Sequence, residues 1–143
     1  MNSPLLSTTA SNVNWLLSQF AANTTGVEHA IAVSSDGLLM AISSDMDRAT
    51  ADRIAAIITG MRSLAEGTSR LLNAGGVQQV IVELGVSFFF VASISGGAAL
   101  GVVAEKNCDL GHVGYEIALL VERVGSQLTP ELIAELKSSV GGL

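Results

Sequence analysis

The sequence predicts an α+β sandwich, in which helices cover both faces of a five-stranded antiparallel sheet. Its centre is one long amphipathic helix of 27 residues, Asp47–Asn73. Two strands precede this helix and three follow it, and tight turns join the strands within each group. Apolar side chains fall on both faces of the first two strands, so the sheet needs helices above and below it.

The composition is that of a single domain without nucleic-acid or membrane-spanning character. The 143 residues are 49% hydrophobic, which is enough to fill one core. The net charge of −6 opposes binding to nucleic acid and to anionic membranes. The longest apolar run, Val86–Ile94, has about half the length of a membrane helix. We therefore expect no nucleic-acid partner and no direct membrane insertion.

Cysteine usage and the first residues favour the cytoplasm. Cys108 is the only cysteine, which excludes an internal disulfide and leaves no cysteine cluster for zinc. The first 12 residues lack the basic segment and the apolar core of a signal peptide. We expect a cytoplasmic protein, which its partners could recruit to a membrane.

The first part of the chain predicts a tail, a helix and a hairpin. Residues 1–10 are rich in Ser and Thr without periodicity, so we expect a mobile tail. A short helix over residues 11–23 starts at Ser11, a favourable N-cap. Strands at Val27–Ser34 and Leu38–Ser43 flank Ser35-Asp36-Gly37, a hairpin-turn signal.

The long helix has two contrasting sides. The centre of its apolar sector is expected to rest on the sheet: Ile54, Ile58, Met61, Ala65 and Leu72. The opposite side carries almost no side chain: Ala49, Ala56, Gly60, Ser63 and Gly67. We call these five residues the small-residue stripe. Glycines at C-cap spacing follow Asn73 and end the helix.

Three strands come next and form a meander. They cover Val77–Leu84, Ser87–Ile94 and Ala98–Ala104, and glycine-containing turns join them. No Pro or Lys protects the first of them, which is typical of an edge that pairs with another strand.

Two helices complete the chain. One begins at Asn107 or Asp109 and ends at Gly125. A short tail helix from Pro130 to about Ser138 has Thr129 as its N-cap. We divide the chain into a tail (1–10), a domain (11–125) and a C-terminal extension with a short helix (126–143).

Signatures of catalysis are missing from the sequence. It has neither the Gly-x-x-x-x-Gly-Lys-Ser/Thr loop of nucleotide hydrolases nor the Gly-x-Ser-x-Gly of serine hydrolases. Packing or surface roles are favoured for His29 and His112 over metal ligation. Cys108 lies before a helix start, which could lower its thiol pKa, but no partner cysteine exists. We expect a protein that is not an enzyme and that holds no cofactor or metal.

The small-residue stripe and the arginines of the long helix each allow two interpretations. Solvent-facing helix positions usually hold long polar residues, and glycine costs about 1 kcal/mol relative to alanine. Contact with another chain is therefore favoured over a solvent-facing side of no consequence. Four arginines lie on this helix: Arg48, Arg53, Arg62 and Arg70. Solvated flanks are favoured over a finger that enters a GTPase, because a rigid helix reaches poorly into a pocket.

Several stretches in a fixed order resemble one known family. AIAVSSDGLLMAIS precedes the long helix, and VQQVIVELGVSFFFVASISGGAALGVVAEKNCDLGHVGYEIALLVERV follows it. The most specific elements are Ser34-Ser35-Asp36-Gly37-Leu38 and Asp109-Leu110-Gly111 with Tyr115-Glu116. From Asn12 to Val124 the chain resembles the Roadblock / dynein light chain family, and within it the bacterial branch of MglB-type regulators of Ras-like GTPases.

This resemblance implies an arrangement and a dimer. The long helix would cover one face of the sheet, and the first and last core helices the other. In the implied homodimer the third strands pair edge to edge and two long helices lie side by side. The expected interface comprises Val77, Gln79, Val80, Ile81, Val82, Glu83 and Leu84, with Arg53, Ile57, Leu64 and Leu71 on one helix flank. The other flank, with Arg48, Asp52, Glu66 and Arg70, should be solvated.

The resemblance also implies an accessory of small GTPases. We expect a non-catalytic homodimeric regulator, activating or co-activating, that docks a Ras-like GTPase across its paired helices without inserting an arginine. The expected docking residues are the small-residue stripe (Ala49, Ala56, Gly60, Ser63 and Gly67) with Asp52 and Arg70. The alternative is an interaction scaffold or signalling-complex subunit without effect on nucleotide turnover. A third hypothesis is a small-molecule sensor with a pocket under Phe88–Phe90.

Overall fold

The computed structural model describes residues 7–43 and 45–141, and its elements follow the predicted order. The helices are α1 (Thr8–Asn23), α2 (Arg48–Leu72), α3 (Leu110–Gly125) and α4 (Pro130–Gly141), with a short 3₁₀ turn, η1 (Ser95–Gly97). The strands are β1 (Val27–Val33), β2 (Leu39–Ile42), β3 (Gln79–Glu83), β4 (Ser87–Ser93) and β5 (Ala99–Glu105). The predicted α+β fold is confirmed, and no strand end differs from the prediction by more than two residues.

The five strands form one antiparallel sheet in the order β2-β1-β5-β4-β3. The meander β3-β4-β5 and the hairpin β1-β2 meet where β1 pairs with β5, at the centre of the sheet. β2 and β3 are therefore the two edge strands. The two edges have very different surroundings.

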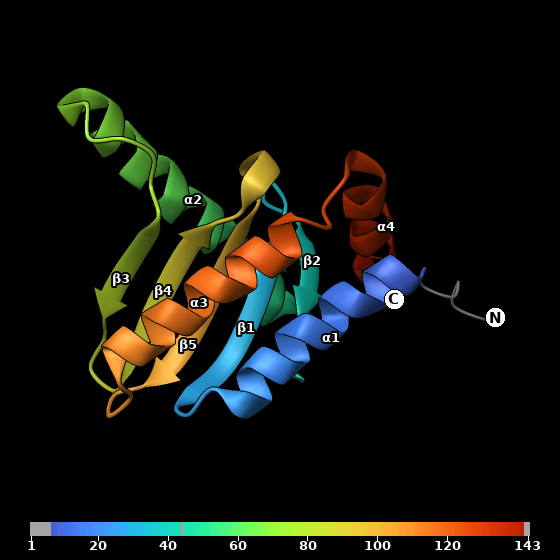
Figure 1. Cartoon of the computed structure of the whole chain (residues 1–143), viewed down its shortest axis with the longest axis horizontal. Coiled ribbons are helices and arrows are strands. Elements are labelled where there is room, and N and C mark those ends of the chain that lie inside the picture. Colours follow the sequence, from blue (N-terminus) through green and yellow to red (C-terminus); the bar gives the residue numbers. More distant parts are fainter. Residues whose placement is uncertain (1–6, 44, 142–143) are drawn as a thin grey trace.

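Helices cover both faces of this sheet, as expected (Figure 1). On one face α1 and α3 pack over a core that includes Leu17, Phe90 and Ile117. On the other face α2 packs over a core that includes Ile31 and Ile58. The domain thus has three layers, and α2 alone forms one outer layer.

A glycine lets α2 approach the sheet closely. A Cβ added to Gly101 on β5 would overlap the side chain of Ile58, so only glycine leaves space for this isoleucine. Ala51 and Ala55 on the same side of α2 are also buried against the sheet. Small residues in this layer bring the α2 backbone near the strands and fix its position.

Capping residues set the helix ends. The Asp47 carboxylate accepts from the backbone N–H of Ala49 (3.3 Å) and of Thr50 (3.1 Å) at the start of α2. Asn73 ends α2 in the left-handed conformation, with φ of 51°. The Asp109 carboxylate caps α3, which decides between the two N-caps that the sequence allowed.

The first helix begins earlier than predicted. α1 starts at Thr8, and the Ser7 hydroxyl accepts from the backbone N–H of Ala10 at 3.1 Å. The expected tail over residues 1–10 is therefore wrong for Thr8, Thr9 and Ala10, which are helical. The residues that precede Ser7 lie outside the described part of the chain. Ser7 and Ser11 can both act as an N-cap. The prediction started the helix at Ser11 because the apolar pattern begins only after that residue.

The tail helix is longer than predicted and packs against the domain. α4 reaches Gly141 instead of about Ser138, and Thr129 caps it by accepting from the backbone N–H of Leu132 at 3.1 Å. Leu132 and Leu136 join the core beneath α1 and α3. α4 lies beside β2, at the edge of the sheet opposite β3 (Figure 1).

Candidate dimer and partner-docking surface

The first half of α2 rests on the sheet, whereas its second half extends beyond it (Figure 1). Ile58 is fully buried, and Ile54 and Met61 pack against the same core, as predicted. Leu72 was predicted to rest on the sheet as well, but its side chain is 70% exposed. The helix has passed the end of the strands by then, and helical spacing alone does not show where a sheet stops.

A row of large apolar side chains lies uncovered along one flank of α2. Ile57, Leu64 and Leu71 recur every seven residues and are 49%, 77% and 87% exposed. Such spacing keeps side chains in line along a helix and is typical of two helices that pack lengthwise. Arg53 lies one turn before Ile57 and is exposed too. The structure thus leaves the whole flank that was predicted to meet a second helix accessible.

The edge of β3 is also open. Ile81 is 50% exposed and Glu83 is exposed, whereas Val80 and Val82 are half-buried against the core beneath α2. Leu84, in the turn after β3, adds a further exposed apolar side chain. Exposed apolar side chains beside an unpaired strand edge are typical of a surface that another chain covers.

Polar contacts fix the ends of this strand. The Gln79 amide donates to the backbone carbonyl of Gly114 at 2.9 Å, which ties β3 to α3. The Lys106 ammonium pairs with Glu83 at 2.9 Å and donates to the carbonyl of Leu84 at 2.6 Å. Val77, in the segment before β3, is half-buried. The strand is positioned from within the chain, and no described strand pairs with its outer side.

The small-residue stripe faces away from the sheet. Ala49, Ala56, Gly60 and Ser63 are exposed, and Gly67 is half-buried. A Cβ added to Gly60 would meet no atom of the described residues within 4 Å outside the helix's own backbone. Since nothing in the described chain crowds Gly60, its lack of a side chain is not explained by packing inside the chain.

Two charged residues border the stripe. Asp52 pairs with Arg48 one turn earlier, with 2.9 Å between Arg48 Nε and the carboxylate. Arg70 is exposed in the last turn of α2, where a cation interacts favourably with the helix dipole. Asp52 and Arg70 thus lie at the two ends of α2, on either side of Gly60.

Arg62 is not a solvated flank residue, and that expectation is wrong. Its side chain is only 12% exposed. The guanidinium donates to the carbonyl of Gly97 and, at 3.4 Å, to that of Ala98, and it lies 3.6 Å from the Glu66 carboxylate. Arg62 therefore holds the η1 turn against α2. Helical spacing places Arg62 one turn after Ile58, toward the sheet, but the carbonyl that it binds lies 35 residues later in the chain.

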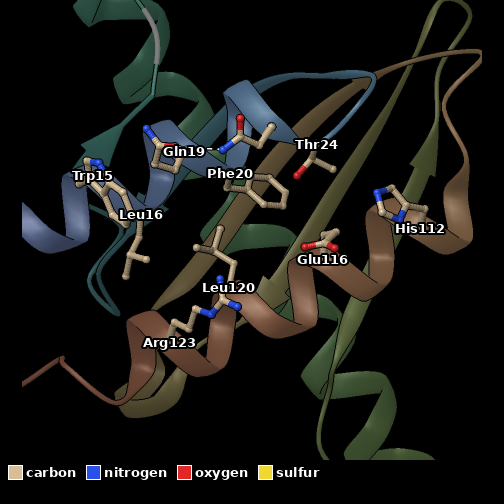
Figure 2. Close-up of a pocket in the computed structure, with 10 residues that line it drawn as sticks. Trp15, Leu16, Gln19, Phe20, Thr24, His112, Glu116, Leu120 and Arg123 are labelled. Atoms are coloured by element: carbon tan, nitrogen blue, oxygen red, sulfur yellow. Dashed lines mark hydrogen bonds between the residues drawn. The ribbon is translucent and has the colours of Figure 1, made fainter.

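A separate groove of about 390 Å³ lies between α1 and α3, on the face away from α2 (Figure 2). Phe20 and Leu120 contribute its apolar part. The charged or titratable side chains that line it, His112, Glu116 and Arg123, come from α3. Within residues 7–43 and 45–141, no three His, Cys, Asp or Glu side chains are grouped as a metal site requires.

The phenylalanines and the cysteine that the sequence analysis considered as functional candidates lie in packed surroundings. Phe88, Phe89 and Phe90 are buried and divided between the two cores. Burial of the Cys108 thiol raises its pKa, and the neighbouring carboxylates of Glu105 and Asp109 act in the same direction. This thiol therefore stays protonated at neutral pH, although it lies near a helix start. No helix within the described residues is both long and apolar enough to cross a membrane.

Comparison with known proteins agrees with this fold. The Roadblock/LC7 domain model matches residues 13–104. A Roadblock/LC7 domain from Streptomyces avermitilis is 34% identical, with a TM-score of 0.73 over 78% of this chain and 92% of that one. Myxococcus xanthus MglB is 13% identical, with a TM-score of 0.75 over 81% and 94% of the chains.

MglB with a tetrameric arrangement is 15% identical, with a TM-score of 0.76 over 86% of this chain and 92% of that one. At these identities the MglB structures show the fold alone. No curated protein matches the sequence significantly. The family model covers more than half of the chain, and the Streptomyces domain shares a third of its residues. The chain therefore belongs to the Roadblock/LC7 family.

Proposed function

We propose that this chain is a homodimeric, non-catalytic regulator of a small Ras-like GTPase. Two copies pair through β3, and their α2 helices lie side by side. The GTPase docks across the paired helices on the small-residue stripe. The observation that carries the proposal is α2 itself, which presents an uncovered apolar flank and, beside it, a face almost without side chains.

The apolar flank and the β3 edge support the dimer. α2 and β3 are neighbours at one end of the sheet (Figure 1). Antiparallel pairing of β3 with its copy satisfies the backbone groups of the open edge. It also places Ile57, Leu64 and Leu71 where they can be buried against the second α2.

The small-residue stripe supports a docked partner. The distance between packed helices depends on the side chains at the contact, so Ala49, Ala56 and Gly60 allow another backbone close to α2. Asp52 and Arg70 border the approach and supply charges that select the orientation of the partner. Regulators of the MglB type share this fold, which favours a GTPase among possible partners.

The arginines of α2 favour activation without an inserted guanidinium. Arg62 is buried against η1, and Arg48 is held by Asp52 and by the carbonyl of Val140. Arg70 remains exposed but sits on a rigid helix. The regulator would then act by ordering the catalytic groups of the GTPase.

Single-turnover GTP hydrolysis by the cognate GTPase tests this proposal. Arg70→Ala should raise the regulator concentration that gives half-maximal stimulation and leave the maximal rate unchanged. Loss of the stimulation at saturation, by a factor of about 10³ to 10⁵, would identify Arg70 as a finger. Unchanged hydrolysis, nucleotide exchange and binding with wild-type regulator would overturn the proposal. Binding without any effect on turnover would instead establish the scaffold.

Gly60→Arg tests the docking surface. The added side chain projects into open space, so the domain should fold and dimerise as the wild type does. GTPase binding should be lost, as measured by calorimetry, while sedimentation still shows a dimer. A monomeric Gly60→Arg variant would show that the stripe packs one α2 against the other. Ser138→Arg, at an exposed position of α4, is the matched control and should keep both properties.

A further inference from the structure

β2 is an edge strand whose surroundings resemble those of an interior one. The strand order places nothing beyond β2 on its outer side. Nevertheless Leu39, Met40 and Ala41 are at most 4% exposed. The faces of the sheet account for the burial of the side chains, but an open edge would leave the strand backbone accessible. Another element must therefore cover this edge.

α4 supplies that cover. Leu132 and Leu136 enter the core beneath α1 and α3, whereas Val140 packs against the core beneath α2. The two cores lie on opposite faces of the sheet, so a helix that contributes to both must cross its edge. Among the helices, α4 makes the most extensive approach to β2, and Figure 1 shows it beside that strand.

Three polar contacts hold α4 in this place, one to each neighbouring element. The Glu135 carboxylate accepts from the backbone N–H of Ser7 at 2.6 Å, before α1. The Lys137 ammonium lies 3.1 Å from the Asp36 carboxylate in the β1–β2 turn. The Arg48 guanidinium of α2 donates to the carbonyl of Val140.

Without α4, β2 would be an aggregation-prone edge. Its sequence, Leu-Met-Ala-Ile, contains no charge and no proline, and such edges pair with strands of other copies. We propose that α4 is an edge cap: it occupies the β2 edge within the chain and confines strand pairing between copies to β3. That α4 covers the β2 edge does not depend on the proposed dimer. The further conclusion, that assembly stops at two copies, does rest on it. A chain with both edges open would add copies without limit.

The full chain with Leu132→Ser and Leu136→Ser tests the cap by releasing α4. Ala134→Ser with Ser138→Ala changes exposed positions of the same helix and serves as the control. Sedimentation velocity is measured in the wild-type background and in an Ile81→Lys background, which blocks pairing through β3. Release of α4 should at least double the mass in both backgrounds, and the control should change neither. An unchanged mass, while hydrogen exchange shows β2 exposed, would overturn the proposal.

The specificity of the new contact is tested with a synthetic peptide of residues 127–143. If β2 pairs with another copy, excess peptide should occupy the edge and return the mass to that of the control. Larger species that ignore the peptide would mean non-specific association and would contradict the cap. If Ile81→Lys alone stays dimeric, the β3 interface is wrong, but the mass change on release of α4 still tests the cap.

A milder variant decides the matter if the double serine variant does not fold. Lys137→Glu places two carboxylates together at Asp36 without disturbing the core. It should make the β2 amides exchange at least threefold faster, and Asp36→Lys in the same chain should restore the wild-type rate. Exchange that stays at the wild-type rate in Lys137→Glu, or that the second change does not restore, would contradict α4 as the cover of β2.

Discussion

The two edge strands of the sheet, β2 and β3, differ in what covers them. On its outer side, each strand has backbone N–H and C=O groups that no neighbouring strand pairs with. At β2 a helix of the same chain covers the strand, and its residues are at most 4% exposed up to Ala41. At β3 no described residue takes this place, and Ile81 remains half-exposed. The difference shows that the β2 edge is covered within the chain, whereas the β3 edge would be covered by a second copy in the proposed dimer.

The surroundings of the two edges sharpen this contrast. Near β2 the charged side chains of Asp36, Lys137 and Arg48 hold the cover in place. By contrast, α2 exposes Ile57, Leu64 and Leu71, and the turn after β3 exposes Leu84. Several of the large exposed apolar side chains thus lie on α2 and in the turn after β3, whereas Trp15 and Leu38 are exposed elsewhere. The proposed two-fold interface would bury the apolar side chains of α2 and of this turn.

The largest effect is expected from Leu136→Ala at the covered edge. Leu136 is fully buried, so its truncation should lower the free energy of unfolding by about 2 to 5 kcal/mol. Chemical denaturation measures this loss. Ser138→Ala, on the exposed side of α4, should change stability by less than about 0.5 kcal/mol. Equal effects of the two variants would show that α4 is not packed in solution.

Ile81→Lys should act on assembly at the open edge. Ile81 is a better position than Val82 for this substitution, because Val82 also packs against the core beneath α2, so a lysine there would disturb the fold. Removing the half-exposed isoleucine from both copies costs about 2 to 3 kcal/mol, which weakens the dimer roughly 30- to 150-fold before charge repulsion is added. Analytical ultracentrifugation measures the dissociation constant. Leu38→Lys changes a residue of similar exposure, 53%, away from β3 and should leave the dimer intact.

Asp47→Ala should have a smaller effect on α2, which borders both edges. The loss of this N-cap removes acceptors from the backbone N–H groups of Ala49 and Thr50 and costs about 1 kcal/mol. Thermal unfolding measures the change. Asp47→Asn keeps a capping oxygen and should retain most of the stability. If alanine and asparagine were equivalent, the cap would contribute nothing.

The smallest effect is a pH dependence at the covered edge. The Ser34 hydroxyl and Lys137 lower the pKa of Asp36 below its ordinary value of 3.8. The folded state therefore gains stability above this value and loses it as pH falls through the lower folded pKa. An NMR titration should show α4 amides shifting at a pH below 3.8, and Asp36→Asn should remove that step. A step that persists in Asp36→Asn would assign it to another group.

Local signals in the sequence predicted the elements of the fold. Helix ends are marked by Asp47, Asn73 and Thr129, and turns by Ser35-Asp36-Gly37 and Gly96-Gly97. Each of these signals is local, because capping and turn residues act on backbone groups a few positions away. The order of elements and the two-sided apolar pattern then left few arrangements. The resemblance to a family supplied the faces on which the helices lie.

Features that depend on distant parts of the chain were not predictable in the same way. Leu72 has the correct helical phase, but it lies beyond the end of the sheet. Arg62 is charged, yet the carbonyls of Gly97 and Ala98 make its burial possible. The place of α4 depends on a vacant edge beside β2, which no local pattern of Leu132 and Leu136 reveals. Most of the predicted docking and interface residues are exposed, whereas Val80 and Val82 pack inward, and their partners stay a prediction.

Hydrogen exchange of β3 and β2 at increasing protein concentration tests the central claim most directly. The outward amides of Gln79–Glu83 should become protected as the chain dimerises, at the concentration where sedimentation shows the mass doubling. The amides of Leu39–Ile42 should be protected at every concentration, because α4 covers them within one chain. Exchange in β3 that does not change with concentration, or protection of β2 that grows with it, would contradict the assignment of the two edges.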